Sequence, residues 1–458
     1  MGLTLDYSNM MISPGGVDAG ALQSSAATFR AAHAKFEERR RSGSLGFVDL
    51  PDNRQLLDQV SRYAETARGQ YDDVVILGIG GSALGPIALR TALRPSGWNM
   101  LDERARRSFP RLHVLDNVDP GTIAALLDRL RLARTLFIVT SKSGGTAETM
   151  AQFLIVHARL VSEGLEIARH LVFVTDPKTG ALRPLAQRLG VVALDIPANV
   201  GGRFSVLTPV GTLPAALIGI DVKSLLAGAG SMAARCSAGD LLRNPAGVYA
   251  VLQWLADTRL GKSIVVFMPY SDALRDFASW FVQLWAESLG KIRPDGTSVG
   301  STPVAALGAT DQHAQVQLFM EGPADKTVTF VTVAQRATDV EIPSAFSDVT
   351  ELGYLGGHSL GELIDIEHRS TAGALARRGR PNMTIRLEKV DAHHVGELMM
   401  FLELATAYAG ELYGVDAFNQ PGVELGKQFA YALLGRPGAD AARKEWDSLP
   451  KGDPRWSV

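Results

Sequence analysis

The chain has 458 residues, of which 46% are hydrophobic, and this is enough to fill two compact lobes. Its formal net charge of −2 provides no broad basic field for a nucleic-acid backbone, and no basic amphipathic segment suggests a membrane surface. Cys236 is the only cysteine, which excludes an internal disulfide and cysteine-based metal clusters. The first residues carry neither a secretory pattern nor a myristoylation signal, so we expect a cytoplasmic protein that binds no nucleic acid and no membrane.

Short apolar runs alternate with helical patterns in the first half of the chain. These runs carry few charges, as expected of parallel strands covered on both faces: VVILGIG (74–80), LHVLD (112–116), TLFIVTS (135–141), HLVFVTD (170–176) and VVALDI (191–196). Segments between them, such as PGTIAALLDRLRLA, have apolar residues at helical spacing. The alternation predicts a doubly wound α/β lobe with a parallel sheet.

A second series of the same kind follows. It begins with SIVVFMPY (263–270), continues through the helical stretch SDALRDFASWFVQLWAESLG and returns to strand at TVTFVTV (327–333). GGRFSVLTPVGTLPAALIGID lies between the two series, where we expect the chain to cross from one lobe to the other. After about residue 390 the pattern is helical. The predicted fold is therefore α/β, with two doubly wound parallel-sheet lobes and a helical C-terminal segment.

The stretch SKSGGTAET (141–149) comes where a predicted strand gives way to a helix. Ligands bind at the carboxyl ends of strands in open parallel sheets, and the first N–H groups of a helix have no partner within it. Ser141, Ser143 and Thr146 add hydroxyl donors, while Gly144 and Gly145 let the backbone come close to a ligand. The stretch is suited to a phosphate monoester, but it is equally compatible with simple capping of the helix by Thr146 or Ser143.

A second glycine cluster, GIGGSALGP (78–86), also follows a predicted strand. It does not fit the G-x-G-x-x-G fingerprint of dinucleotide sites, and no acidic residue closes a following strand at the distance that a ribose requires. We expect it to face the same crevice as the first loop, with Gly81 and Ser82 placed to touch the unphosphorylated part of a small ligand. No histidine, cysteine or carboxylate stretch has metal-ligand spacing, so we expect no metal cofactor.

Six motifs in order resemble the glucose-6-phosphate isomerase family, also called phosphoglucose isomerase: GIGGSALGP, SKSGGTAET, NVGGRFSVLTPVG, AESLGK, ATDQHAQVQ and FNQPGVELGKQ. The resemblance implies two sugar-isomerase-type lobes of unequal size, no metal or organic cofactor, a small sugar phosphate as substrate, and a homodimer. We expect the first lobe over 45–230 and the second over 1–44 and 231–415. The C-terminal segment, 416–458, then carries the catalytic lysine.

The resemblance also implies roles for single residues. Glu287 in AESLGK matches the base that moves a proton between C2 and C1 through a cis-enediol(ate); without its motif it would be an exposed acid near a helix end. Arg203 in GGRFS matches the arginine that faces the enediolate oxygens, the alternative being a structural salt bridge. His313 in DQHAQVQ and Lys427 in GVELGKQ match the pair that opens the sugar ring.

Three further positions complete the expected substrate site. Lys142 belongs to the phosphate loop, and Gln283 and Gln420 match family positions near the phosphate and the sugar. Gln283 lies one helical turn before Glu287, so both can share a helix face. The chain departs from many relatives by having Gly144 and Gly145 in the phosphate loop, which leaves fewer side-chain donors, and Asn419 before Gln420.

The expected reaction is reversible isomerisation of glucose 6-phosphate and fructose 6-phosphate in glycolysis and gluconeogenesis. Two alternatives remain at this point. One is an isomerase that also accepts mannose 6-phosphate, which requires tolerance at C2. The other is a non-catalytic sugar-phosphate sensor, which needs the two glycine loops but not the four catalytic residues together.

Overall fold

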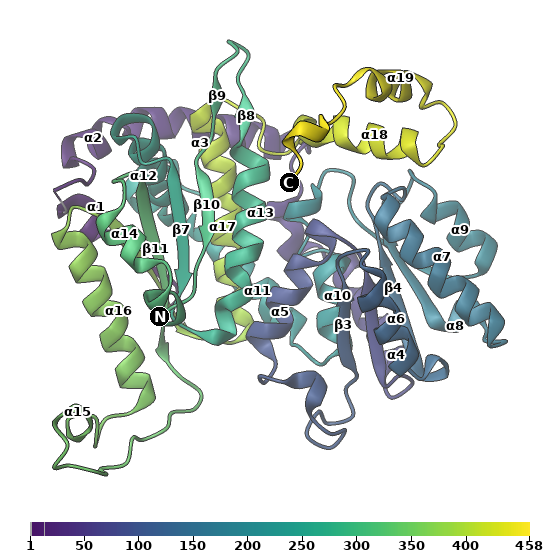
Figure 1. Cartoon of the computed structure of the whole chain (residues 1–458), viewed down its shortest axis with the longest axis horizontal. Helices are drawn as coiled ribbons and strands as arrows, with labels where there is room; N and C mark the ends of the chain where they lie inside the picture. Colours follow the sequence, from purple (N-terminus) through teal and green to yellow (C-terminus); the bar gives the residue numbers. More distant parts are fainter. Residues whose placement is uncertain (1, 13) are drawn as a thin grey trace. The chain divides into compact units, whose positions relative to one another are not determined.

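The computed structural model describes residues 2–12 and 14–458 (Figure 1). The chain divides into two compact units, Met1–Ala417 and Phe418–Val458, and each is described here by itself. Within the described residues the strands form two five-stranded sheets and one two-stranded ribbon, all in the first unit. The predicted division into 45–230, 1–44 with 231–415, and 416–458 remains a prediction.

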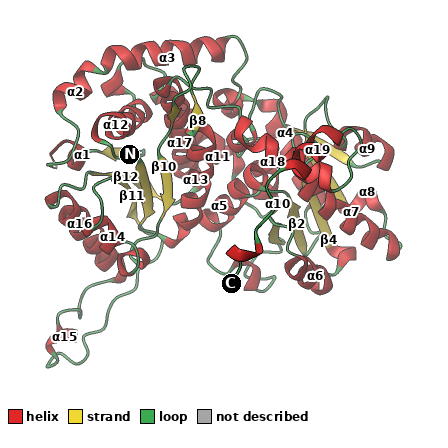
Figure 2. Cartoon of the chain, turned by 45° about the horizontal axis from the view of Figure 1, so that its top comes forward, coloured by secondary structure: helices red, strands yellow, loops and turns green. Residues whose placement is uncertain are grey.

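The first sheet has the strand order β3-β2-β4-β5-β6, with every neighbouring pair parallel. Its strands are β2 (Asp73–Leu77), β3 (Arg111–Leu115), β4 (Thr135–Thr140), β5 (Leu171–Thr175) and β6 (Val192–Asp195). Strands β2, β4 and β5 are buried along their whole length, since helices cover both faces of the sheet (Figure 2). This confirms the predicted doubly wound lobe.

The helices of this lobe connect successive strands or cover them. They are α4 (Arg54–Ala67), α5 (Leu84–Leu93), α6 (Pro120–Arg129), α7 (Ala147–Ser162), α8 (Ile167–His170), α9 (Leu182–Leu189) and α10 (Pro209–Leu217). Helix α10 packs against α4 and α5, whereas the next helix, α11 (Val222–Arg235), packs against the long helix α17 (Ala392–Tyr413). The chain therefore crosses between the lobes at the end of α10, at the far end of the predicted segment.

The second sheet has the order β1-β12-β11-β7-β10. Its parallel strands are β7 (Ile264–Pro269), β10 (Thr302–Ala305), β11 (Lys326–Gln335) and β12 (Asn382–Lys389), and β1 (Thr4–Asp6) adds an antiparallel edge. The strands at 263–270 and 327–333 confirm the prediction, while β1, β10 and β12 were not predicted. The two-stranded ribbon joins β8 (Lys291–Ile292) to β9 (Ser298–Val299).

Helix α17 is the centre of the second lobe, because nearly all of its residues are buried among neighbouring helices. The other helices here are α1 (Ser8–Ile12), α2 (Ala19–Ser24), α3 (Ala26–Arg41), α12 (Pro245–Leu260), α13 (Arg275–Leu289), α14 (Val316–Glu321), α15 (Thr350–Gly353) and α16 (Leu360–Arg377). No helix among the described residues combines the length and apolarity needed to cross a membrane.

The sole cysteine lies where α11 ends. The Cys236 side chain is buried, and this burial raises the pKa of its thiol to about 12. Its thiol lies 3.7 Å from the Met232 sulfur, one turn back along the helix. Cys236 is thus a packed core residue.

The segment that carries α15 extends from the second lobe as an arm, defined here as residues 340–358 (Figures 1 and 2). Its base is closed by backbone hydrogen bonds, among them Ile342 N–H to the His358 carbonyl at 2.8 Å. Large apolar side chains on the arm face solvent, including Phe346 and Tyr354, each 69% exposed.

The second unit is built around two helices of similar length, α18 (Glu424–Leu433) and α19 (Asp440–Ser448). Phe429 and Trp446 hold them together through an edge-to-face ring contact with centroids 5.5 Å apart. The predicted helical C-terminal segment is confirmed.

Candidate active site

The two glycine loops lie at neighbouring strand ends of the first sheet. The loop after β2 contains Gly80–Ser82, and the loop after β4 contains Ser141–Thr146. From β2 the chain goes to β3 on one side and then returns to β4 on the other, so these two strands flank the point where the winding reverses. Ligands of open parallel sheets bind at this point. The strand order is therefore consistent with one crevice shared by both loops.

The hydroxyls of the phosphate loop bond to one another. The Thr146 hydroxyl lies 3.0 Å from that of Ser141 and 3.4 Å from that of Ser143, and Gly144 N–H donates to Ser141 Oγ at 3.1 Å. Thr146 is the N-cap residue of α7, yet its side chain makes no capping bond in the described part of the chain. Side-chain capping by Thr146 was therefore the wrong alternative. Ser141 is buried and supports the loop, whereas Ser143 is exposed at the mouth of the helix.

Two glycines allow the phosphate loop to lie on a neighbouring turn. Gly144 has φ +61°, and a Cβ there would be 2.8 Å from Ala181 N. Gly180 has φ +84°, and a Cβ there would be 2.2 Å from the Ser143 carbonyl oxygen. Both positions require glycine, because of the left-handed backbone and the lack of space. The role of Gly180 was not predicted, since the turn after β5 carries no motif of its own.

Lys142 connects the phosphate loop to the segment before Arg203. Its Nζ donates to the carbonyl oxygens of Ala198 and Val200, both at 2.8 Å. Burial lowers the pKa of this amine, and Asp176 partly opposes the shift. The side chain is thus engaged with backbone here, and its expected contact with a substrate remains a prediction.

The first glycine loop contacts the segments that carry the other predicted residues. A Cβ at Gly81 would be 2.4 Å from the Gly202 carbonyl oxygen and 2.8 Å from Arg203 N. A Cβ at Gly80 would be 2.9 Å from Gln283 Nε2. These glycines bring Arg203 and Gln283 beside the first glycine loop, which also carries the half-buried Ser82.

Arg203 and Glu287 face each other. Arg203 Nη1 lies 3.6 Å from Glu287 Oε2, and the arginine side chain is 3% exposed against 27% for the glutamate. Arg203 Nε donates to Ser288 Oγ at 2.7 Å, and Nη2 donates to the Ala417 carbonyl. Burial lowers the pKa of Arg203, while Glu287 and Asp416 oppose the shift. A fixed cation thus faces a partly accessible carboxylate, which is an arrangement that can stabilise developing negative charge.

Gln283 completes this group on helix α13. Its Nε2 donates to Glu287 Oε2 at 3.2 Å, as expected for residues one turn apart. Its Oε1 is buried without a hydrogen-bond partner among the described residues. Buried acceptors are rarely left unpaired, so this oxygen is suited to receive a hydroxyl of a ligand.

Lys291 is a member of the site that sequence reasoning missed. Its Nζ donates to the carbonyl oxygens of Ser288 and Asp416, both at 2.9 Å. Burial lowers its pKa to about 8, helped by the charge of Arg203 and opposed by Asp416 and Glu287. The only signal was its place in AESLGK, because Asp416 is far away in the sequence.

The structure does not bring His313 to Glu287 within one chain. His313 is exposed in the turn Thr310–His313 after β10, and its neighbour Gln312 accepts a hydrogen bond from Tyr270 Oη at 2.5 Å, just beyond the end of β7. Helix α13 begins near this end, at Arg275, and Glu287 follows twelve residues later. At 1.5 Å per residue this is a separation of ~18 Å along the helix.

Lys427 and Gln420 belong to the second unit, so the geometry of the first unit says nothing of their distance from Glu287. Lys427 is on α18, where its Nζ donates to Glu424 Oε1 at 2.9 Å. Among residues 2–12 and 14–458, no three histidine, cysteine or carboxylate side chains gather as metal ligands.

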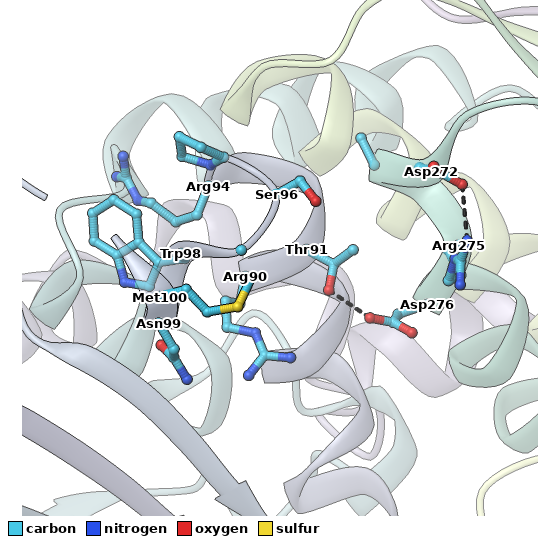
Figure 3. Close-up of a pocket in the computed structure, with 13 residues that line it drawn as sticks. Arg90, Thr91, Arg94, Ser96, Trp98, Asn99, Met100, Asp272, Arg275 and Asp276 are labelled. Atoms are coloured by element: carbon cyan, nitrogen blue, oxygen red, sulfur yellow. Dashed lines mark hydrogen bonds and ion pairs between the residues drawn. The ribbon is translucent and has the colours of Figure 1, made fainter. Parts of the chain in front are cut away.

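A separate hollow of about 520 Å³ lies between the C-terminal end of α5 and the N-terminal end of α13 (Figure 3). Thr91 Oγ1 donates to Asp276 Oδ2 at 2.5 Å across it, and Arg275 pairs with Asp272 at 3.0 Å. None of the predicted site residues is among those that line it. The hollow therefore does not include the two glycine loops.

Comparison with known proteins shows relatives along most of the chain. The phosphoglucose isomerase profile matches residues 54–452. The chain is 46% identical to the glucose-6-phosphate isomerase of Carboxydothermus hydrogenoformans, covering 93% of each chain. It is also 46% identical to that of Rubrobacter xylanophilus, covering 95% of this chain and 99% of the other.

Solved structures give the same result. A crystal structure of a hypothetical protein from Thermus thermophilus matches with a TM-score of 0.85 at 41% identity, covering 94% of this chain and 100% of the other. A glucose-6-phosphate isomerase from Chlamydia trachomatis matches with a TM-score of 0.79 at 21% identity, covering 98% and 92%. The second likeness shows the shared fold.

Proposed function

Since the chain belongs to the phosphoglucose isomerase family, we propose that the group around Arg203 and Glu287 interconverts glucose 6-phosphate and fructose 6-phosphate. This is an aldose–ketose isomerisation that serves glycolysis and gluconeogenesis. We place the reaction in the cytoplasm. The observation that carries the assignment is the buried Arg203 guanidinium, held 3.6 Å from the more accessible Glu287 carboxylate beside the two glycine loops.

Glu287 acts as the base. It takes the proton from C2 of the open-chain aldose and returns it to C1, passing through a cis-enediol(ate). Arg203 Nη1 faces the carboxylate, so it is placed to stabilise the enediolate oxygens that form beside it. Because its other two nitrogens are bound to Ser288 and Ala417, the guanidinium needs no reorganisation during the reaction.

The phosphate of the substrate occupies the loop after β4. The exposed Ser143 hydroxyl, the Thr146 hydroxyl and the first N–H groups of α7 are its donors, and the buried Ser141 holds the loop in shape. Lys142 adds a positive charge nearby. Gly81, Ser82 and Gln283 contact the sugar, and the unpaired Oε1 of Gln283 receives one of its hydroxyls.

We assign ring opening to His313 and Lys427, and a contact with the substrate to Gln420. The ~18 Å of helix between the His313 end of α13 and Glu287 favours a homodimer in which His313 enters the site of the neighbouring subunit. The exposed apolar side chains of the arm 340–358 support such a dimer.

A coupled assay tests the proposed function. Fructose 6-phosphate is supplied, and the glucose 6-phosphate formed is oxidised by a dehydrogenase that reports it. We expect turnover that depends on Glu287, and the same assay with mannose 6-phosphate measures the tolerance at C2. Binding of fructose 6-phosphate without turnover would replace the enzyme by a sugar-phosphate sensor.

A further inference from the structure

The first unit ends in a turn, Asp416–Ala417, that is packed tightly against α17. The helix stops at Gly414, which has φ +72°, and Val415 N–H then bonds back to the Gly410 carbonyl at 2.9 Å. A Cβ at Gly410 would lie 2.7 Å from Ala417 Cβ. The buried Ala417 therefore rests on the bare backbone of Gly410.

Three cations from three separate segments bind this turn. Arg203 Nη2 donates to the Ala417 carbonyl, Lys291 Nζ donates to the Asp416 carbonyl at 2.9 Å, and Arg39 Nη2 donates to Asp416 Oδ1 at 2.9 Å. We call this set of contacts the 416–417 clamp. Charge-assisted hydrogen bonds are stronger than neutral ones, and the clamp places three of them on two residues, two on backbone carbonyls and one on the Asp416 carboxylate.

Two of these cations also contact Glu287 or the residue next to it. Arg203 faces Glu287, and Lys291 donates to the Ser288 carbonyl, on the residue next to Glu287. The guanidinium of Arg203 is planar, so a shift of Ala417 either moves its Nη1 relative to Glu287 or breaks the bond to Ala417. The position of the turn and the geometry of the base are therefore coupled through bonds on both sides.

The turn also begins the segment that carries two predicted substrate contacts. Gln420 follows Ala417 by three residues and Lys427 follows it by ten. We infer that Lys291 is a positioning residue of the isomerase: by holding the Asp416 carbonyl against the end of α13, it fixes both the Arg203–Glu287 geometry and the origin of the segment with Gln420 and Lys427. This inference rests on the proposed function.

Two variants disturb the clamp in different ways. Lys291→Met removes the donor, and Lys291→Arg restores charge and donors. Gly410→Ala replaces no residue of the proposed catalytic group but pushes a methyl group against Ala417. Gly373→Ala, in α16, is the matched control because its added methyl meets nothing within 4 Å.

We expect Lys291→Met and Gly410→Ala to lower kcat for fructose 6-phosphate by about 10- to 100-fold, with KM within about threefold because the phosphate loop is untouched. Lys291→Arg should recover much of kcat, and Gly373→Ala should match the wild type. Amide hydrogen exchange over 415–420 should quicken in the two damaged variants while exchange in β2 and β4 stays unchanged.

Wild-type kcat in both variants, despite faster exchange over 415–420, would overturn the inference. A lowered melting temperature with unchanged kcat would reduce Lys291 to a structural cross-link and would overturn it as well. If Lys291→Met does not fold, Gly410→Ala decides. Exchange is measured on the free enzyme, so a failure of the proposed isomerase activity is distinguishable from a failure of the clamp.

Discussion

At the scale of single residues, the contacts of Arg203 are compatible with both roles considered for it, a structural cross-link and a catalytic cation. Its Nε and Nη2 cross-link Ser288 and Ala417, which is the structural role, and its Nη1 remains directed at Glu287. The buried cross-links keep the guanidinium in place, and the nitrogen that faces Glu287 is the one to which we assign the proposed catalytic role. The sequence motif identifies the residue but not this division of its donors.

Replacing Glu287 by Gln tests the base. The amide oxygen can still accept the Gln283 hydrogen bond, so binding of fructose 6-phosphate should stay within about tenfold of wild type while isomerisation falls by roughly 10²–10⁴. Exchange of the C2 proton of glucose 6-phosphate with deuterated solvent, followed by NMR, should occur in the wild type and nearly vanish in the variant. Glu65→Gln, at an exposed position of α4, is the control. Exchange at the wild-type rate in Glu287→Gln would assign the base to another residue.

At the scale of elements, the phosphate loop acts as one unit with the start of α7. Ser143→Ala with Thr146→Ala should raise KM for fructose 6-phosphate more than it lowers kcat, since these hydroxyls bind a group that does not react. Steady-state kinetics measures both constants. Ser162→Ala with Thr258→Ala removes two hydroxyls that donate to carbonyls of their own helices, and this pair of substitutions should change neither constant. An equal loss in the control pair would show that the effect is unspecific.

His368 makes the packing of α16 on its sheet sensitive to acid. It makes edge-to-face contacts with the rings of Tyr270 and Phe330. Burial lowers its pKa to about 4, with Asp365 and Asp6 opposing the shift and Arg369 and Arg386 adding to it. Between the ordinary histidine pKa and pH 4 the unfolded chain binds a proton that the folded chain does not. The free energy of unfolding should therefore fall as the pH drops through this range, by about 3 kcal/mol at most.

The comparison with His368→Gln isolates this effect. Denaturant unfolding of both proteins between neutral pH and pH 4 should give curves that converge as the wild type loses its advantage. Curves that stay parallel would show that His368 titrates normally in the folded protein.

The strands that the sequence predicted and those it missed differ in their surroundings. Strands β2, β4, β5 and β7 are covered on both faces and form continuous apolar runs. Strand β12 reads NMTIRLEK, and its Thr384 and Arg386 line an open hollow of about 840 Å³ beside α16. It therefore alternates polar and apolar residues, which is itself typical of a half-covered strand, and the criterion of continuous apolar runs does not find it. Strands β1 and β10 are too short to show any period.

At the scale of the whole molecule, the sequence could identify those parts of the candidate site whose residues lie within one short motif. The loops after β2 and β4, Gln283 and Glu287 could be identified from their motifs. The partners of Lys291 and Arg203 in the turn Asp416–Ala417 could not, since more than a hundred residues separate them in sequence and only tertiary packing joins them. The place of His313 at the far end of α13 likewise follows from the topology alone.

Mixed oligomers test whether His313 acts in the neighbouring subunit. Chains with Glu287→Gln and chains with His313→Ala should each be nearly inactive alone. If His313 serves the partner's site, a hybrid dimer contains one site with both native residues, and equal coexpression should restore about a quarter of wild-type activity per chain. No recovery in hybrids of confirmed composition would place Glu287 and His313 in the same subunit's site.

Because Cys236 is buried, cysteines introduced elsewhere in the native sequence can be labelled site-specifically. The thiolate is the form that attacks maleimides, and with a pKa of about 12 this thiol remains protonated and covered near neutral pH. Cysteines introduced at the exposed Leu154 of α7 and Leu434 after α18 would then be the only reactive thiols. A donor and acceptor dye on that pair would let single-molecule fluorescence follow the second unit relative to the phosphate loop, turnover by turnover, without first removing a native cysteine.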